Sequence, residues 1–230
     1  MNRFELRPWD PHWPPPPLGR RRARRGRHES VLGKILEADT NLVIWRREGG
    51  PAALPPAALD YTARLADRGD AFEVGLDEGG RPRDLRRMPR WPGRDALIED
   101  WAKAQAMFRE LVNDHAVEAK VEMVTHDKCR LFHGDFNRLR WLCTYAGPGT
   151  QWVADGDVDR VALARDDIPR DQRNQHVVPD ARRIQQVDAG DVILLKGYDF
   201  PGNAGGAAVH RSPPLAERGL TRLLLTLTSR

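Results

Sequence analysis

Residues 220–228 read Leu-Thr-Arg-Leu-Leu-Leu-Thr-Leu-Thr, a run that predicts a buried β-strand because branched and apolar side chains dominate it. This run is the last of about eight short runs that begin near Glu118 and are separated by Gly, Pro and Asp. The others are 118–126, 138–145, 151–154, 158–164, 182–187, 191–196 and 206–210. Many short strands with this punctuation favour a sandwich, jelly roll or barrel. We therefore expect the C-terminal part, 118–230, to be a double-stranded β-helix, the core of an α+β domain.

The segment before this β region, residues 29–117, is expected to be mainly helical and to pack on it within one domain, 29–230. Helices are predicted from Ser30 to about Ala38, from 56 to 68 and from 94 to 113, with a buried strand at 42–45. In the third helix the apolar residues recur at a spacing of three and four and form one stripe: Leu97, Trp101, Ala104, Phe108 and Leu111. This helix should bury that stripe in the core.

The first 28 residues differ in composition from the rest of the chain. They contain eight Arg and two acids, a net charge of +6, whereas the whole chain has +4, so the remaining 202 residues carry −2. A Pro-rich stretch precedes the Arg cluster, and such a composition cannot bury a core. We expect residues 1–28 to be a disordered arm. Nucleic-acid binding is expected, if at all, through this arm, because the body is slightly acidic.

Cysteine content and hydropathy limit the cellular setting. Cys129 and Cys143 are the only cysteines, too few for a disulfide framework, and they suit a reducing compartment. No run approaches the length of roughly 18 apolar residues that a membrane span needs, and the N-terminus lacks the apolar core of a secretory signal. These features predict a cytoplasmic protein that does not bind membranes.

Two histidines and an aspartate in the β region form a candidate metal site. In extended backbone His133 and Asp135 project to the same side, and His210 precedes the last strand. Two imidazoles and one carboxylate suit Fe(II) and leave coordination positions for a keto acid and dioxygen. Arg222 on the last strand could bind the far carboxylate of that keto acid, with Arg218 as the alternative. These three ligands would then be the catalytic residues of an oxygenase.

Other interpretations of the same region remain open. His126 and Cys129, with His133 and with Cys143 or Asp135 nearby, could bind zinc in a protein that is not an enzyme. Either histidine alone could equally be an ordinary hydrogen-bonded residue, and each cysteine a small buried apolar one. The segment 147–150 is read as a turn between strands, because the Lys of a phosphate-binding loop is missing. Ser212 is a poor candidate nucleophile because two prolines follow it.

Three longer strings carry a resemblance to known proteins: Cys129-Arg-Leu-Phe-His133-Gly-Asp135, Leu139-Arg140-Trp-Leu-Cys143-Thr-Tyr145-Ala-Gly147-Pro148-Gly149-Thr150-Gln-Trp152-Val, and Leu195-Lys196-Gly197 with Val-His210-Arg211-Ser212-Pro213-Pro214. They resemble the bacterial domain-of-unknown-function family numbered 1826. The order of the motifs is also similar to that of the Fe(II)- and 2-oxoglutarate-dependent oxygenase superfamily. The first resemblance implies a link to zinc-homeostasis proteins, because members tend to be encoded near such genes. The second implies Fe(II) and 2-oxoglutarate as cofactors, with an unknown substrate.

Overall fold

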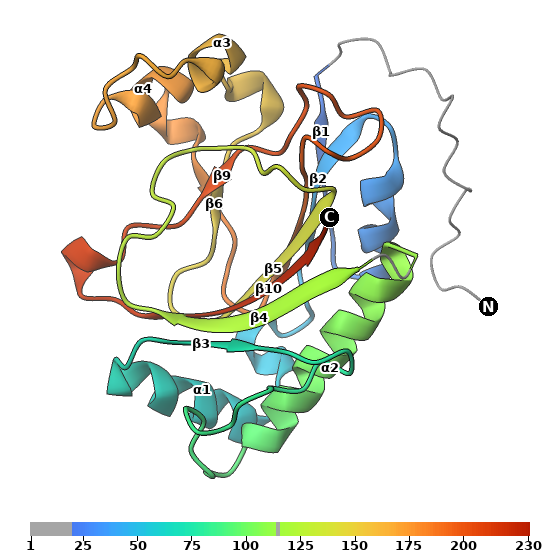
Figure 1. Cartoon of the computed structure of the whole chain (residues 1–230), viewed down its shortest axis with the longest axis vertical. Coiled ribbons are helices and arrows are strands. Elements are labelled where there is room, and N and C mark those ends of the chain that lie inside the picture. Colours follow the sequence, from blue (N-terminus) through green and yellow to red (C-terminus); the bar gives the residue numbers. More distant parts are fainter. Residues whose placement is uncertain (1–19, 114–115) are drawn as a thin grey trace.

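The structure is a computed structural model that describes residues 20–113 and 116–230 and has a mixed α/β fold dominated by one large sheet (Figure 1). Seven strands form this sheet in the order β1 (Arg22–Gly26), β2 (Thr40–Trp45), β8 (Val192–Lys196), β5 (Leu139–Ala146), β10 (Arg222–Ser229), β4 (Val117–Val124) and β3 (Phe72–Gly75). All neighbouring strands are antiparallel except β1 and β2. A second, small sheet has the order β7 (Gln185–Gln186), β6 (Gln151–Trp152) and β9 (His210–Arg211).

The two faces of the large sheet are buried in different ways because side chains alternate along each strand. One face packs on helices α1 (Pro56–Arg68) and α2 (Arg94–Leu111), which lie side by side against the sheet in Figure 1. The expected apolar stripe of α2 is buried there, as the spacing predicts. The opposite face, which we call the concave face, packs on the small sheet through Leu142, Ile193 and Leu224 on one side and Trp152 on the other. The concave face also carries the polar residues considered below.

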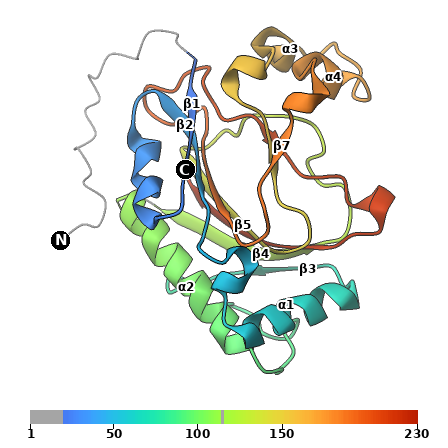
Figure 2. The ribbon, with the colours of Figure 1, turned by 180° about the vertical axis from the view of Figure 1, so that it is seen from behind.

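Short helices complete the described part of the chain. They are the 3-10 helices η1 (Glu29–Leu36), η2 (Gly50–Ala53), η3 (Asp155–Asp157), η4 (Ala181–Arg183) and η5 (Ala216–Arg218), and the α-helices α3 (Arg160–Ala164) and α4 (Arg173–Val177). A separate apolar cluster joins α3 and α4 to Phe132 and Val209 beside the small sheet. Both views place α3 and α4 far from α1 and α2 (Figures 1 and 2). The small sheet therefore has its own outer cover.

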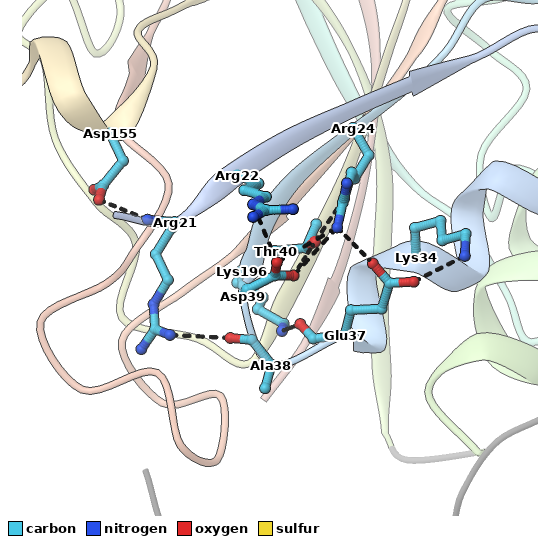
Figure 3. A network of polar contacts seen from close by, with 10 residues as sticks. All are labelled: Arg21, Arg22, Arg24, Lys34, Glu37, Ala38, Asp39, Thr40, Asp155 and Lys196. Carbon is cyan, nitrogen blue, oxygen red and sulfur yellow. Dashed lines mark hydrogen bonds and ion pairs between the residues drawn. The ribbon is translucent and has the colours of Figure 1, made fainter. Parts of the chain in front are cut away.

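The N-terminal segment differs from the expected helical layer and arm. Residues 29–117 do contain α1 and α2, but they also supply β2 and β3 to the large sheet. Residues 1–19 of the expected disordered arm lie outside the described residues, whereas Arg22–Gly26 form the edge strand β1. Ion pairs hold this strand: Arg24 contacts Glu37 and Asp39, and Arg22 also contacts Asp39 (Figure 3). Residues 22–26 are therefore ordered and not part of a disordered arm, because Arg22 and Arg24 pair with nearby acids.

Four of the strands expected after Glu118 are confirmed at nearly full length, as β4, β5, β8 and β10, and three more, 151–154, 182–187 and 206–210, are strand only over one or two residues, in β6, β7 and β9. The segment 158–164 was expected to be a strand, but Arg160–Ala164 form α3. The carboxylate of Asp159 accepts a hydrogen bond of 2.9 Å from the backbone N–H of Ala162 and caps the helix. Val161 is 74% exposed, so its branched side chain is not part of a buried strand face. The local cap decides the structure of this segment.

Among the described residues, no helix combines the length and the apolar character that crossing a membrane requires.

Candidate metal centre

The structure brings His133, Asp135 and His210 together on the concave side, where the two sheets meet. His133 lies in the long connection between β4 and β5 and forms an isolated bridge with His210 of β9, with two backbone hydrogen bonds of 3.1 Å each. One donor atom from each of the three side chains lies within 4.8 Å of the others. Among the described residues this is the only group of three or more His, Cys, Asp or Glu side chains that could hold a metal ion.

Backbone carbonyls orient both imidazoles. The Nδ1–H of His133 donates to the carbonyl of Leu131 at 2.8 Å, and that of His210 donates to the carbonyl of Ala208 at 3.2 Å. These bonds leave both Nε2 atoms as free electron-pair donors, 3.6 and 3.5 Å from the Asp135 carboxylate. Asp135 is 6% exposed, and its Oδ2 has no hydrogen-bond partner. An orphaned buried carboxylate oxygen beside two aligned Nε2 atoms fits a divalent metal ion.

The electrostatics of Asp135 and His210 favour the protonation state that a metal ligand needs. Burial lowers the pKa of His210 to about 4, so this imidazole is neutral at neutral pH. Burial also lowers the pKa of His133, but the interaction with Asp135 outweighs it and the net shift is upward. Burial raises the pKa of Asp135, but His210, His133 and Arg140 together hold it well below its usual range. The site therefore presents an ionised carboxylate and at least one neutral imidazole.

Gly134 allows the two ligands on either side of it to take this position. A Cβ at residue 134 would lie 2.8 Å from the Cβ of Ala207 and 2.9 Å from the Cε2 of Tyr198, closer than real contacts allow. The ring of Tyr198 thus packs directly on the backbone between His133 and Asp135. The backbone N–H of Tyr198 also donates to the carbonyl of Asp135 at 2.8 Å. Tyr198, in the segment after β8, therefore packs against residues 133–135 and holds them in place.

Arg140 is a residue of the site that the sequence patterns left ambiguous. Its Nη1 donates to the Oδ1 of Asp135 at 2.8 Å, so an arginine of β5 directly contacts the candidate ligand. In the sequence, Arg138 and Arg140 alternate with apolar residues, a pattern that fits arginines facing an anionic substrate and equally fits a half-exposed strand. The side chain of Arg140 is 28% exposed, which agrees with half exposure, and it points to the concave side. Only the pairing of distant segments shows that it meets Asp135.

Of the two arginines considered as keto-acid anchors, the structure places only Arg222 on the concave face. Arg222 is 2% exposed, and its guanidinium donates to the hydroxyls of Thr144 at 2.9 and 3.0 Å and of Thr150 at 2.6 Å. No carboxylate among the described residues pairs with it, and burial lowers its pKa to about 10. Arg218 lies on η5 and is exposed. Arg222 is thus a buried cation without a direct ion pair, on which Glu122 acts only from a longer distance.

The residues of the expected zinc cluster do not come together. Cys143 is buried on the helix-covered face of the large sheet, where its thiol lies 3.8 Å from the carbonyl of Gly190. Cys129 is exposed, and His126 is exposed as well. Ser212 donates its backbone N–H to the carbonyl of Cys129, so the two lie on neighbouring segments. Among the described residues, neither His126 nor Cys129 belongs to a group of three possible ligands.

Comparisons with known proteins place the chain in a family and beside solved structures. Solved structures that it resembles include a dioxygenase for auxin oxidation from rice, with 13% identity, coverage of 91% of this chain and 82% of that chain, and a TM-score of 0.47. A putative oxygenase from Shewanella oneidensis has 13% identity, coverage of 92% and 90%, and a TM-score of 0.47. A prolyl-4-hydroxylase from Pseudomonas putida has 14% identity, coverage of 87% and 97%, and a TM-score of 0.45. No curated protein matches the chain.

The sequence match to a protein family is more extensive. It runs over residues 26–228 and therefore includes the His133-Gly134-Asp135 string, His210 and Arg222. The family is described as a protein of unknown function, DUF1826. Because the match spans most of the chain, this protein belongs to the DUF1826 family.

Proposed function

We propose that this protein is an Fe(II)- and 2-oxoglutarate-dependent oxygenase built on a double-stranded β-helix. His133, Asp135 and His210 would hold the iron between the large and the small sheet. When bound, Fe(II) with a 2-oxo acid supplies the activation of dioxygen, coupled to oxidative decarboxylation of the acid. One observation carries the proposal: a His/Asp/His set with an orphaned carboxylate oxygen shares the concave face with a buried arginine that has no carboxylate partner.

Arg222 supports the choice of a dicarboxylate co-substrate. Burying a guanidinium without an opposite charge is costly, and hydroxyl groups alone do not offset that cost. Thr144, which accepts two of its hydrogen bonds, lies four residues along β5 from Arg140, roughly 13 Å at about 3.3 Å per residue. A small dicarboxylate could therefore bind the metal with one end and Arg222 with the other.

This chain's own residues would perform the remaining tasks. The carbonyls of Leu131 and Ala208 keep each imidazole in the tautomer that offers Nε2 to the metal. Arg140 fixes the orientation of the Asp135 carboxylate. The apolar residues of the concave face, such as Ile193 and Leu224, exclude water from the other side of the site.

The test is binding of 2-oxoglutarate to the anaerobic Fe(II) protein, followed by the charge-transfer absorption band and by calorimetry. The protein should bind iron and then 2-oxoglutarate. Arg222→Met should weaken 2-oxoglutarate binding at least about tenfold while iron stays bound, because a charge-assisted pair is lost. Arg218→Met is the matched control and should bind 2-oxoglutarate like the wild type. Tight zinc binding with no response to 2-oxoglutarate would favour a metal-binding protein that is not an oxygenase.

A further inference from the structure

Arg140 has more hydrogen-bonding capacity than its contact with Asp135 uses. Within the described part of the chain, the bond from Nη1 to Asp135 is its only hydrogen bond, and its Nε is buried without a partner. The guanidinium offers five N–H donors in a planar fork. Its side chain is 28% exposed, so part of that fork can be reached from outside. A buried orphaned donor beside a candidate metal site indicates a missing acceptor.

The neighbours of Arg140 on the concave face are suited to an anion. In the strand register Thr228 of β10 lies opposite Arg140 on one side, and Leu195 of β8 lies opposite on the other. Thr228 is 8% exposed, and its hydroxyl has no hydrogen bond to any described residue. Next to it on the same face, Thr226 is also 8% exposed and its hydroxyl is likewise without a described partner. Arg140 and these two threonines form a strip of polar side chains, with the apolar Leu195 beside it.

A count of formal charges shows that this strip stays positive when the proposed cofactors are bound. A divalent metal, the Asp135 carboxylate and the 2-oxoglutarate dianion sum to one negative charge, and Arg222 and Arg140 add two positive charges. One positive charge therefore remains. The acidic side chains of the neighbouring strands β3 and β4 are already paired: Glu73 and Glu122 with Lys120 and Lys128, and Glu118 with Arg230. They do not compensate Arg140.

We infer that the primary substrate carries an oxyanion, a carboxylate, sulfonate or phosphate group, which binds Arg140 and Thr228 beside the metal. Arg140 is then a specificity-determining residue as well as the partner of Asp135. The identification of this anion as the substrate rests on the proposed oxygenase function. Anion binding at Arg140 can nevertheless be measured separately from any reaction.

The test uses methanesulfonate as the anionic probe and dimethyl sulfone as a neutral molecule of similar size. Protein with Mn(II) and 2-oxoglutarate bound is titrated with each probe, and the relaxation enhancement of the probe's methyl protons reports binding near the metal. Methanesulfonate should bind in preference to the sulfone. Arg140→Met should weaken methanesulfonate binding about tenfold, because a charge-assisted pair is lost. Arg140→Lys should recover part of it.

Arg165→Met is the control, because Arg165 also pairs with an aspartate, Asp167, through exposed side chains that make no contact with the candidate ligands or with the residues that orient them. It should bind methanesulfonate like the wild type. Equal binding of the two probes, or unchanged methanesulfonate binding in Arg140→Met, overturns the inference. So does an effect of Arg140→Met on 2-oxoglutarate binding alone, since Arg140 would then serve the co-substrate.

Electron paramagnetic resonance of free Mn(II) separates this inference from the proposed function. If Mn(II) binds and methanesulfonate does not, the metal centre stands and the inference fails. If Mn(II) does not bind, the proposed function fails, and the probe titration is repeated on metal-free protein by saturation transfer. Loss of methanesulfonate binding in Arg140→Met would still support an anion site there, and no loss would overturn it.

Discussion

At the scale of single residues, backbone geometry and side-chain charge position the three candidate metal ligands. Gly134 shows this most directly, because the ring of Tyr198 occupies the space where a Cβ would lie. Each imidazole is held by a carbonyl two residues before it, and the aspartate is held by Arg140. The ligand side chains are thus positioned by their own segments and by one strand of the large sheet.

Replacing Gly134 by Ala should therefore disturb the site. The new methyl group must displace Tyr198 or shift the backbone between the ligands, which should cost about 1–3 kcal/mol of stability and weaken metal binding about tenfold. Urea unfolding and a metal titration measure the two effects. Gly79→Ala is the control, because its Cβ would meet only the Asp77 Oδ1 at 3.4 Å. Wild-type metal affinity in Gly134→Ala would contradict this account.

Lys196 is a second residue whose setting has a measurable consequence. It is 2% exposed, its ammonium lies 2.8 Å from the carbonyl of Glu37, and the ring of Phe200 lies 4.3 Å away (Figure 3 shows the contact with Glu37). Burial, with the charge of Arg21, lowers its pKa from 10.5 to about 7. Between these values the unfolded chain holds more protons than the folded chain. The contribution to stability is therefore present above about pH 10.5 and is lost as the pH falls toward 7.

Lys196→Met should stabilise the protein by about 1–3 kcal/mol at pH 7 and reduce the rise in stability between pH 7 and 9.5. The measurement is urea unfolding at the two pH values. The exposed Lys103, changed to Met, is the control and should leave the pH dependence unchanged. A Lys196→Met variant with the pH dependence of the wild type would show that the buried amine is not the cause.

At the scale of elements, a buried polar network fixes α2 to the large sheet. Both nitrogens of the Arg47 fork donate to Asp100 of α2, at 2.5 and 3.0 Å, and the hydroxyl of Tyr145 in β5 donates to the same carboxylate at 2.7 Å. Arg47 and Asp100 are 13% and 15% exposed. The apolar stripe of α2 specifies which face of the helix is buried, and this network adds directional contacts at one point along it.

Asp100→Ala should be strongly destabilising, by about 2–4 kcal/mol, because it leaves a buried guanidinium and a buried hydroxyl without their acceptor. Chemical unfolding measures the loss. Asp167→Ala removes a similar but exposed pair with Arg165, with side chains 68% and 54% exposed, and should change stability by less than about 0.5 kcal/mol. If the two substitutions lower the free energy of unfolding by the same amount, the network does not hold α2 on the sheet.

The same scale shows what the sequence could predict. Periodicity or a continuous apolar run identified α2, β2, β4, β5, β8 and β10, because each of these patterns indicates a buried face, and α1 was identified from its prolines at the start and Gly69 at the end. The edge strand β1 was not predicted because its sequence, mostly arginine, shows no alternation of apolar and polar residues. Its arginines pair with acids that follow it in the chain. α3 was missed because one capping residue, Asp159, outweighs the β propensity of the segment.

At the scale of the whole molecule, the candidate site depends on segments that are distant in sequence. The pairing of His133 with His210 joins the connection after β4 to the small sheet, and Arg222 comes from the last strand. Spacing and residue type were enough to nominate these residues and Asp135. The contact between Arg140 and Asp135 could not be predicted, because it depends on how the loop before β5 folds back over the concave face.

The most direct test of the central claim is the metal content of the anaerobically purified protein, determined by elemental analysis for the wild type, His133→Ala and His176→Ala in parallel. His176 is an exposed histidine of α4 and serves as the control, with circular dichroism to verify folding. The account predicts iron at about one equivalent per chain in the wild type and in His176→Ala, and its loss from a folded His133→Ala. Equal metal content in the two variants, or a wild type that binds no metal when Fe(II) is supplied, would contradict it.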